Sequence, residues 1–383
     1  MKAFHHFPII RQNSHRLIMR TILILPALGA AAILSAPIMI VAILLLLFSV
    51  LARLISSFWE RDNVQTHYET HMFEYDSEIG WRLRPNLDLY GIADEPFHVT
   101  TGPDGWRGNL PIEDADLVVF GDSFAFGHGV DENQMFTKYS GNLKVKSIGV
   151  NGYGMVQGML WMRRLAPSLA GKLVVWFIYY GNDLHENLQP DMETYRMPFV
   201  RQRPESPEWE VVTEHLSKEP WSFRAPAPYY QPLAELCCPT KYADRVFSAV
   251  EYLISEARTI CHSAGTTLVV VGVPERLQLN RRGLMHLQKL ASNNPQFNAN
   301  LPDERLNEIC NRLDIRFESL TTHLKPNDHL ANDVHWQPSG HQKVGALIQR
   351  LYEESDMAAI SRAHPAAQFQ SKAATKKRSR IIA

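Results

Sequence analysis

The chain has 383 residues, enough for one large domain or two ordinary ones, and it carries 39 basic against 40 acidic residues. A net charge of −1 provides no overall field that would attract nucleic acid. The four cysteines are too few for a disulfide scaffold and lack the spacing of a metal site, so we expect neither a metal nor another cofactor.

The first feature along the chain is an apolar segment at residues 21–52. Arg20 and Arg53 bracket it, and no charged residue lies between them. A helix of this length exceeds the roughly 30 Å of a bilayer's hydrocarbon core, so the segment is either one tilted or kinked transmembrane helix or a tight hairpin turning near residues 35–37. Basic residues are more frequent before it, which favours a single crossing with residues 1–20 in the cytoplasm. We therefore expect a membrane protein whose main domain lies on the far, extracytoplasmic side.

Three other segments lack the regular alternation of a folded α/β domain. Residues 59–115 are polar and rich in turn signals, and are interpreted as a connecting segment that packs onto the main domain. Residues 186–240, rich in Pro, Trp, Tyr and Arg, are interpreted as an insertion that forms a lid or substrate wall. Residues 357–383 form a basic tail that we expect to be disordered.

Between these segments, strand and helix patterns alternate. Continuous apolar, β-branched runs predict strands at residues 117–120, 145–150, 173–179, 267–273 and, more weakly, 315–317. Strands that are apolar throughout are typical of parallel sheets covered on both faces. Apolar residues at helical spacing predict helices at residues 242–260, 306–313 and 344–351. Ser339 and Gln342 precede the last of these at capping-box spacing.

This alternation predicts a doubly wound α/β domain over residues 116–356, with a mostly parallel five-stranded sheet. Ligands of such folds bind beyond the carboxyl ends of the strands, and three consecutive strands end here in small or polar residues. Ser123 offers a hydroxyl and its backbone N–H, Gly152 offers a second backbone N–H, and Asn182 offers a side-chain amide. Together they predict a nucleophile beside an oxyanion hole.

A serine nucleophile requires a base. His335 lies in a predicted loop before the last helix, with Asp333 two residues earlier to orient its imidazole. Two other histidines are rivals. His341 near the helix start is interpreted as structural, whereas His185 is close enough to Asn182 to line the pocket.

These motifs resemble the SGNH or GDSL-type serine hydrolases. The run Phe120–Val130 resembles their first block, Gly149–Gly154 the second with Gly152 in the oxyanion position, and Gly181–Asp183 the third with Asn182 as the other donor. Asp333–Trp336 resembles the last block. The resemblance extends over residues 75–355 and includes the lead-in motifs at 80–86 and 104–108. It implies a flavodoxin-like sandwich, a bacterial inner-membrane location and catalysis by Ser123, Asp333 and His335.

One departure from the family's last motif leaves the type of reaction open. The usual last block is Asp-x-x-His, but Asn332 stands three residues before His335 and Asp333 only two. The Asp-x-His-Trp order resembles SGNH-like acetyltransferases that modify polysaccharides. This departure raises the transferase alternative. The leading expectation from the motifs as a set is an ester hydrolase that uses an acyl-enzyme, with an acylated glycan or glycolipid as substrate. The alternatives are an O-acyltransferase with the same site and a non-catalytic SGNH-like binding module.

Overall fold

The computed structural model describes residues 43–51, 71–188, 191–192, 195–214, 216 and 230–355. The chain separates into two compact units, Met1–Val64 and Gln65–Ala383. In the first unit, residues 43–51 form a helix whose large apolar side chains are exposed. Within the described ranges, no helix has both the length and the apolar character needed to span a bilayer. Most of the predicted membrane segment at residues 21–52, and all of the tail at 357–383, lie outside those ranges.

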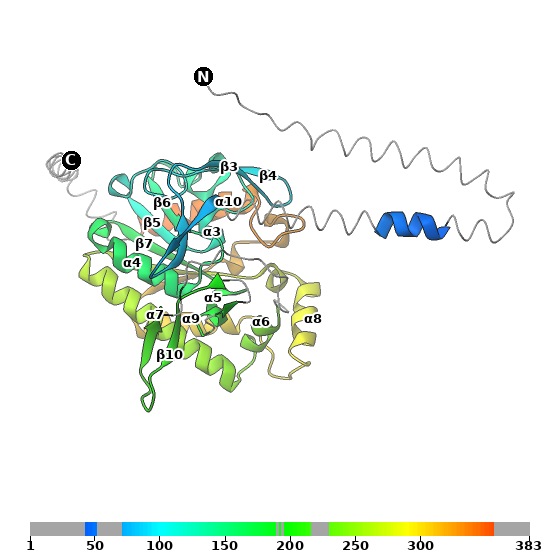
Figure 1. Ribbon diagram of the computed structural model, residues 1–383. Coiled ribbons are helices and arrows are strands. Elements are labelled where there is room, and N and C mark those ends of the chain that lie inside the picture. The colour runs from blue at the N-terminus through cyan, green and yellow to red at the C-terminus, as the bar shows by residue number, and fades with distance from the viewer. Residues whose placement is uncertain are drawn as a thin grey trace, which may run out of the picture. The chain divides into compact units, whose positions relative to one another are not determined.

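The second unit is built on the predicted five-stranded parallel sheet (Figure 1). Its strand order is β13-β12-β7-β5-β6. The direction of strand succession therefore reverses between β5 and β7, as in flavodoxin-like folds, and that reversal marks the usual ligand position. The strands are β5 (Leu117–Gly121), β6 (Val145–Gly149), β7 (Leu173–Tyr179), β12 (Thr267–Val273) and β13 (Arg316–Ser319).

Both faces of the sheet are covered, which explains the continuous apolar runs. Val118 and Phe120 belong to one buried cluster, while Leu117 and Val119 belong to a second. The first cluster includes α4 (Met155–Leu169), α7 (Lys241–Ser263) and α9 (Leu301–Arg312); the second includes α3 (Ser123–Phe126) and α10 (Pro338–Glu353). Alternate side chains of each strand thus enter different cores, so no position of β5 faces solvent.

The predicted capping box before the last helix is wrong. Helix α10 begins at Pro338, and its N-cap residue Gln337 makes no side-chain capping bond. Ser339 lies inside the first turn, where its hydroxyl donates to Asp328 Oδ1 at 3.0 Å. Proline is favoured at the first helical position because its fixed φ suits a helix and its missing N–H is not needed there. The proline therefore moves the helix start ahead of the serine.

The described part of the predicted connecting segment forms two antiparallel hairpins, and Trp81, Phe97 and Trp106 bury it in the first core cluster. In the predicted insertion, the described residues form two further hairpins and a short helix. The hairpin strands and the remaining helices are β1 (Phe73–Asp76), β2 (Gly80–Leu83), β3 (Asp88–Ile92), β4 (Pro96–Thr100), β8 (Asp191–Met192), β9 (Tyr195–Arg196), β10 (Phe199–Gln202), β11 (Trp209–Val212), α5 (Asp183–Glu186), α6 (Gln231–Leu236) and α8 (Arg281–Leu290).

Candidate active site

Ser123 lies on an abrupt turn from strand to helix. Strand β5 ends at Gly121 and α3 begins at Ser123, with only Asp122 between them. Asp122 caps the helix, because its Oδ1 accepts a hydrogen bond from Phe124 N at 2.9 Å. Gly149 at the end of β6 permits this turn, since a Cβ there would lie 2.2 Å from Phe126 N. The helix therefore rests directly on the neighbouring strand and presents Ser123 at the carboxyl edge of the sheet.

The structure brings together Ser123, His335 and Asp333 in one hydrogen-bonded chain. Ser123 Oγ is 2.7 Å from His335 Nε2, although the two residues are 212 positions apart in sequence. Asp333 Oδ1 lies 2.5 Å from His335 Nδ1 and also accepts from the His335 backbone N–H at 2.9 Å. With Nδ1 protonated and donating to the carboxylate, Nε2 is left as the acceptor for the serine hydroxyl. This is the geometry of a serine nucleophile, its base and an orienting acid.

The residue that orients His335 is Asp333, and not Asn332 at the position three residues before the histidine. Burial alone would raise the pKa of Asp333, but the neighbouring His335 charge and hydrogen bonds outweigh it and hold that pKa well below its usual range. Asp333 is therefore ionised at neutral pH. Asn332 is exposed, and its backbone N–H donates to Asp94 at 3.0 Å.

The segment of residues 329–336, which we call the histidine segment, is held by contacts from distant parts of the chain. Trp336 is fully buried and packs against Phe124 with a ring separation of 4.8 Å. Arg276 donates from Nη1 to the carbonyls of Leu330 at 2.7 Å and Ala331 at 3.0 Å. Within the segment, Leu330 N donates to His335 O at 2.9 Å. These contacts fix the segment although it forms no helix and only one isolated bridge.

Gly152 and Asn182, the other predicted oxyanion residues, follow the two strands that flank β5. The register pairs Gly121 with Gly149 and Phe120 with Trp176, so Ser123, Gly152 and Asn182 all come just beyond the same edge. Gly152 has φ +75°, which glycine adopts without strain. Asn182 is buried, and its side-chain Nδ2 donates to Glu186 Oε2 at 2.9 Å. One amide hydrogen of Asn182 is thereby engaged and the second is left for another acceptor.

Three buried carboxyl groups lie at these strand ends. Burial raises the pKa of Asp122 to about 6 and that of Glu186 to about 8, against partial compensation by their hydrogen bonds. Burial also raises the pKa of Asp183 well above its ordinary value, and the nearby Asp122 carboxylate adds to the effect. A predominantly uncharged Glu186 at neutral pH adds no full negative charge where a substrate oxyanion would develop.

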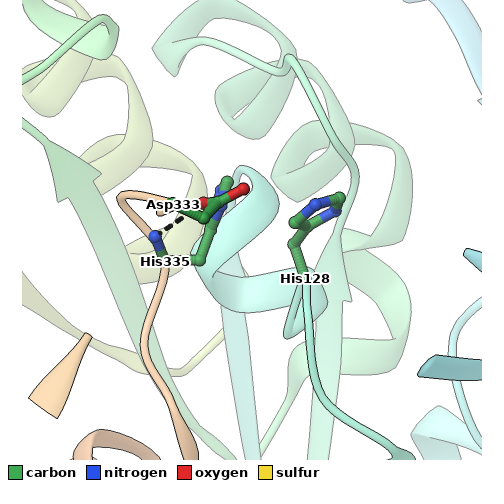
Figure 2. Close-up of side chains that lie close together, drawn as sticks. All are labelled: His128, Asp333 and His335. Carbon is green, nitrogen blue, oxygen red and sulfur yellow. Dashed lines mark hydrogen bonds and ion pairs between the residues drawn. The ribbon is translucent and has the colours of Figure 1, made fainter. Parts of the chain in front are cut away.

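His128 is a neighbour of the site that was not singled out from the sequence. Figure 2 shows its ring beside His335 and Asp333, and the two imidazole centroids are 4.5 Å apart. Its Nδ1 lies 3.0 Å from Asn151 Nδ2, and burial lowers the pKa of His128 to about 3. A neutral imidazole accepting from the amide at Nδ1 carries its proton on Nε2. His128 occupies the variable position in the motif Phe126-Gly127-His128-Gly129-Val130, which was the only signal available for it.

Arg107 fixes the loop that carries His128, and sequence reasoning also assigned it no role. Its buried guanidinium donates to the carbonyls of Phe126 at 3.0 Å, Gly127 at 2.5 Å and Val130. The five donors of an arginine suit such a set of converging carbonyls. The signal for it was its place in a lead-in motif before the sheet.

Among the described residues, one group has the composition of a metal site: His128, Asp333 and His335, whose ligand atoms all lie within 4.8 Å of one another. Two histidines and a carboxylate are a familiar set for a transition metal. Here both ring nitrogens of His335 already have partners, Ser123 and Asp333. Asp333 and His335 therefore belong to the serine-activating arrangement, whereas His128 contacts Asn151.

The two rival histidines lie in different surroundings. His341 is buried, and its Nδ1 accepts from Phe136 N at 3.3 Å, which agrees with a structural role. Burial lowers the pKa of His341 to about 3. His185 is also buried, burial lowers its pKa to about 4, and its Nδ1 has no hydrogen-bond partner among the described residues. None of the hydrogen bonds found in the described part of the chain joins either histidine to Ser123.

No protein-family model matches the sequence, and no curated protein sequence matches it. Similar solved structures include an aryl esterase from M. smegmatis, at 10% identity and a TM-score of 0.36, covering 61% of this chain and 96% of that one. A GDSL-like lipase from Bacteroides thetaiotaomicron, at 13% identity and a TM-score of 0.34, covers 64% of this chain and 91% of that one. A carbohydrate acetylesterase from Sinorhizobium meliloti, at 10% identity and a TM-score of 0.35, covers 61% and 96%. At these TM-scores the likeness establishes no function for this chain.

Proposed function

We propose that this protein is a serine esterase of the SGNH type, acting through an acyl-enzyme. The observation that carries the proposal is the hydrogen-bonded chain from Ser123 Oγ through His335 to Asp333, with distances of 2.7 and 2.5 Å. The motif resemblance and the position of Ser123 beside the reversal of strand order support it.

In the proposed reaction, His335 Nε2 removes the proton of Ser123 as Oγ attacks the carbonyl carbon of an ester. The backbone N–H groups of Ser123 and Gly152 and the free amide hydrogen of Asn182 stabilise the oxyanion, a contribution of about 3–4 kcal/mol for one such donor. The imidazolium then protonates the departing alkoxide. Water, deprotonated by His335, attacks the acyl-enzyme and releases the acid, and the proton returns to Ser123.

A fluorophosphonate probe tests the nucleophile directly. We expect the probe to label the wild-type protein, and Ser123→Ala to abolish labelling. Ser263→Ala, which changes an exposed serine at the end of α7, is the matched control and should label like wild type. A wild type that resists the probe, or equal labelling of Ser123→Ala, would reject the serine-enzyme proposal and favour a non-catalytic binding module.

A second proposal is an O-acyltransferase that passes the acyl group to a sugar hydroxyl. It is favoured by the spacing Asp333-x-His335-Trp336, in which Asp333 makes the contact with His335 Nδ1. To separate the two reactions, an acetyl ester is supplied with and without an oligosaccharide acceptor, and the acetyl group is followed. Acetylated oligosaccharide would support transfer, whereas acetate alone in both samples would reject it.

We further propose that the substrate is an acylated glycan or glycolipid and that residues 21–52 anchor the enzyme in a bacterial inner membrane, with the catalytic unit on the extracytoplasmic side. The uncharged sequence of that segment supports the anchor. Fractionation of the full chain tests it: release into the soluble fraction by high salt alone would contradict an integral anchor.

A further inference from the structure

A buried acid lies behind the predicted oxyanion residue Asn182. Asn182 follows β7, and Glu186 is four residues later, at the end of the short helix α5. Their side chains meet, with Asn182 Nδ2 donating to Glu186 Oε2 at 2.9 Å, and Glu186 is only 3% exposed. The same carboxyl faces the loop that carries the other oxyanion donor, because a Cβ on Gly154 would lie 3.8 Å from Glu186 Oε2.

Helix α5 is itself fixed at its far end. Asn187 donates from Nδ2 to the carbonyl of Asp183 at 2.7 Å and contacts Met155 Sδ at 3.3 Å, at the start of α4. Its own carbonyl accepts from Val200 N at 2.8 Å, on β10. The Glu186 backbone N–H also donates to the Asn182 carbonyl at 3.1 Å, so the position of Glu186 is fixed by main-chain bonds and by the contacts of Asn187, and not by the Asn182 side chain alone.

The orientation of an asparagine amide decides whether it stabilises or repels an oxyanion. Rotation by half a turn exchanges Nδ2 for Oδ1, and the carbonyl oxygen would repel the negative charge. An acceptor fixed on one Nδ2 hydrogen prevents that rotation and leaves the second hydrogen to point elsewhere. Burial keeps Glu186 largely uncharged at neutral pH, so it can accept through its carbonyl oxygen without opposing the oxyanion.

We propose that Glu186 is a positioning residue that orients the Asn182 amide toward the substrate oxyanion. This inference rests on the proposed esterase function and adds to it a residue from the start of the predicted insertion. Glu186 acts only through Asn182, and what it provides is an acceptor oxygen.

Four variants test the proposal with p-nitrophenyl acetate as substrate. Glu186→Met keeps the side-chain volume and removes the acceptor, and we expect kcat to fall about 30-fold with KM changed less than about 2-fold. Glu186→Gln keeps an acceptor and should retain kcat within about 3-fold. Asn182→Ala should lower kcat by about 100-fold or more. Because Glu186 acts only through Asn182, the kcat of the double variant Asn182→Ala with Glu186→Met should be no more than about 2-fold below that of Asn182→Ala alone.

The melting temperature of each variant is measured alongside, and Glu186→Ala serves as the acceptor-free variant if the methionine side chain does not fit. The inference would be overturned by an unchanged kcat in the acceptor-free variant. It would also be overturned if the fold-loss of kcat in the double variant equalled the product of the fold-losses in the two single variants. Absence of hydrolysis and of fluorophosphonate labelling in the wild type would instead reject the esterase function on which it rests.

Discussion

Ser123, Gly152 and Asn182 follow three neighbouring parallel strands, whereas Asp333 and His335 lie in the histidine segment, which forms no helix and only one isolated bridge. The first group is placed by sheet register, so main-chain hydrogen bonds and two packed cores determine its position. The second group is placed by a few side chains from far along the chain, notably Asp94 and Arg276. Changes around the strands should therefore affect stability first, and changes around the histidine segment should affect activity first.

The largest expected effect is at the carboxylate that orients His335. Asp333→Asn should lower kcat by about 10³ to 10⁴-fold, because the amide can present its N–H to Nδ1 and favour the wrong tautomer. Asn332→Ala, the neighbouring control, should change kcat less than about 3-fold, since its bond to another described residue is made by its backbone N–H. Steady-state kinetics give kcat for both variants. A larger loss of kcat in Asn332→Ala than in Asp333→Asn would mean that the residue three positions before His335, and not Asp333, orients the imidazole.

On the strand side, Gly149→Ala should destabilise the fold by about 3 kcal/mol or more, because the new methyl group would overlap the main chain of α3. Gly171→Ala is the control: φ is +73° there, but no atom lies within 4 Å, so only about 1 kcal/mol of backbone strain is expected. Urea unfolding measures both. An equal loss of unfolding free energy in Gly149→Ala and Gly171→Ala would show that α3 does not depend on close contact with β6.

His341 belongs to the scaffold, and its effect should appear in the pH dependence of stability. Its pKa is lowered to about 3 in the folded chain against about 6.5 when unfolded, so the unfolded state binds more protons between these values and stability falls as the pH falls through that window. From pH 7 to pH 5 the loss is about 2 kcal/mol for this histidine.

The variant His341→Gln should therefore lose about 2 kcal/mol less than wild type between those two pH values. Buried acids such as Glu186 shift the curve in the opposite direction in both proteins, so the comparison is between the two proteins and not within one. Urea unfolding at pH 7 and pH 5 gives the result. Parallel curves would mean that His341 titrates normally in the folded chain.

The smallest expected effect is at an anchor of the histidine segment. Asp94→Ala removes the acceptor for Asn332 N and should lower kcat about 10-fold through less accurate placement of His335, with the melting temperature almost unchanged. Asp88→Ala on the same hairpin, whose carboxylate contacts His98, should leave kcat unchanged. A melting temperature that falls in step with kcat would show that the anchor is part of the scaffold.

The sheet and the residues at its edge could be predicted from sequence because they have a local origin. The runs at residues 173–179 and 267–273 match β7 and β12, since a strand buried on both faces must be apolar throughout. Ser123, Gly152 and Asn182 come directly after such runs. Their common edge then follows from parallel pairing alone.

The remaining features depend on contacts between residues that are distant in sequence. Glu186 and His128 are ordinary polar residues in the sequence, and only the fold places one behind Asn182 and the other beside His335. The start of α10 was misplaced for a related reason, because Ser339 bonds to Asp328 in a preceding turn that shows no periodicity. The pairing of His335 with Ser123 was predicted from residue types, whereas its geometry comes from the anchors of the histidine segment.

The distance along the chain between the two groups also bears on the order of folding. Two contacts place His335 beside Ser123. The contact between Ser123 and His335 spans 212 positions of the chain, and the contact between Asp94 and Asn332 spans 238. Closing such long loops has an entropic cost that must be met before the contacts form. We expect refolding from urea to recover the fluorescence of buried tryptophan earlier than fluorophosphonate reactivity. Simultaneous recovery would contradict this order. During folding, on this view, the turn that carries Ser123 forms some time before His335 comes within hydrogen-bond distance of it.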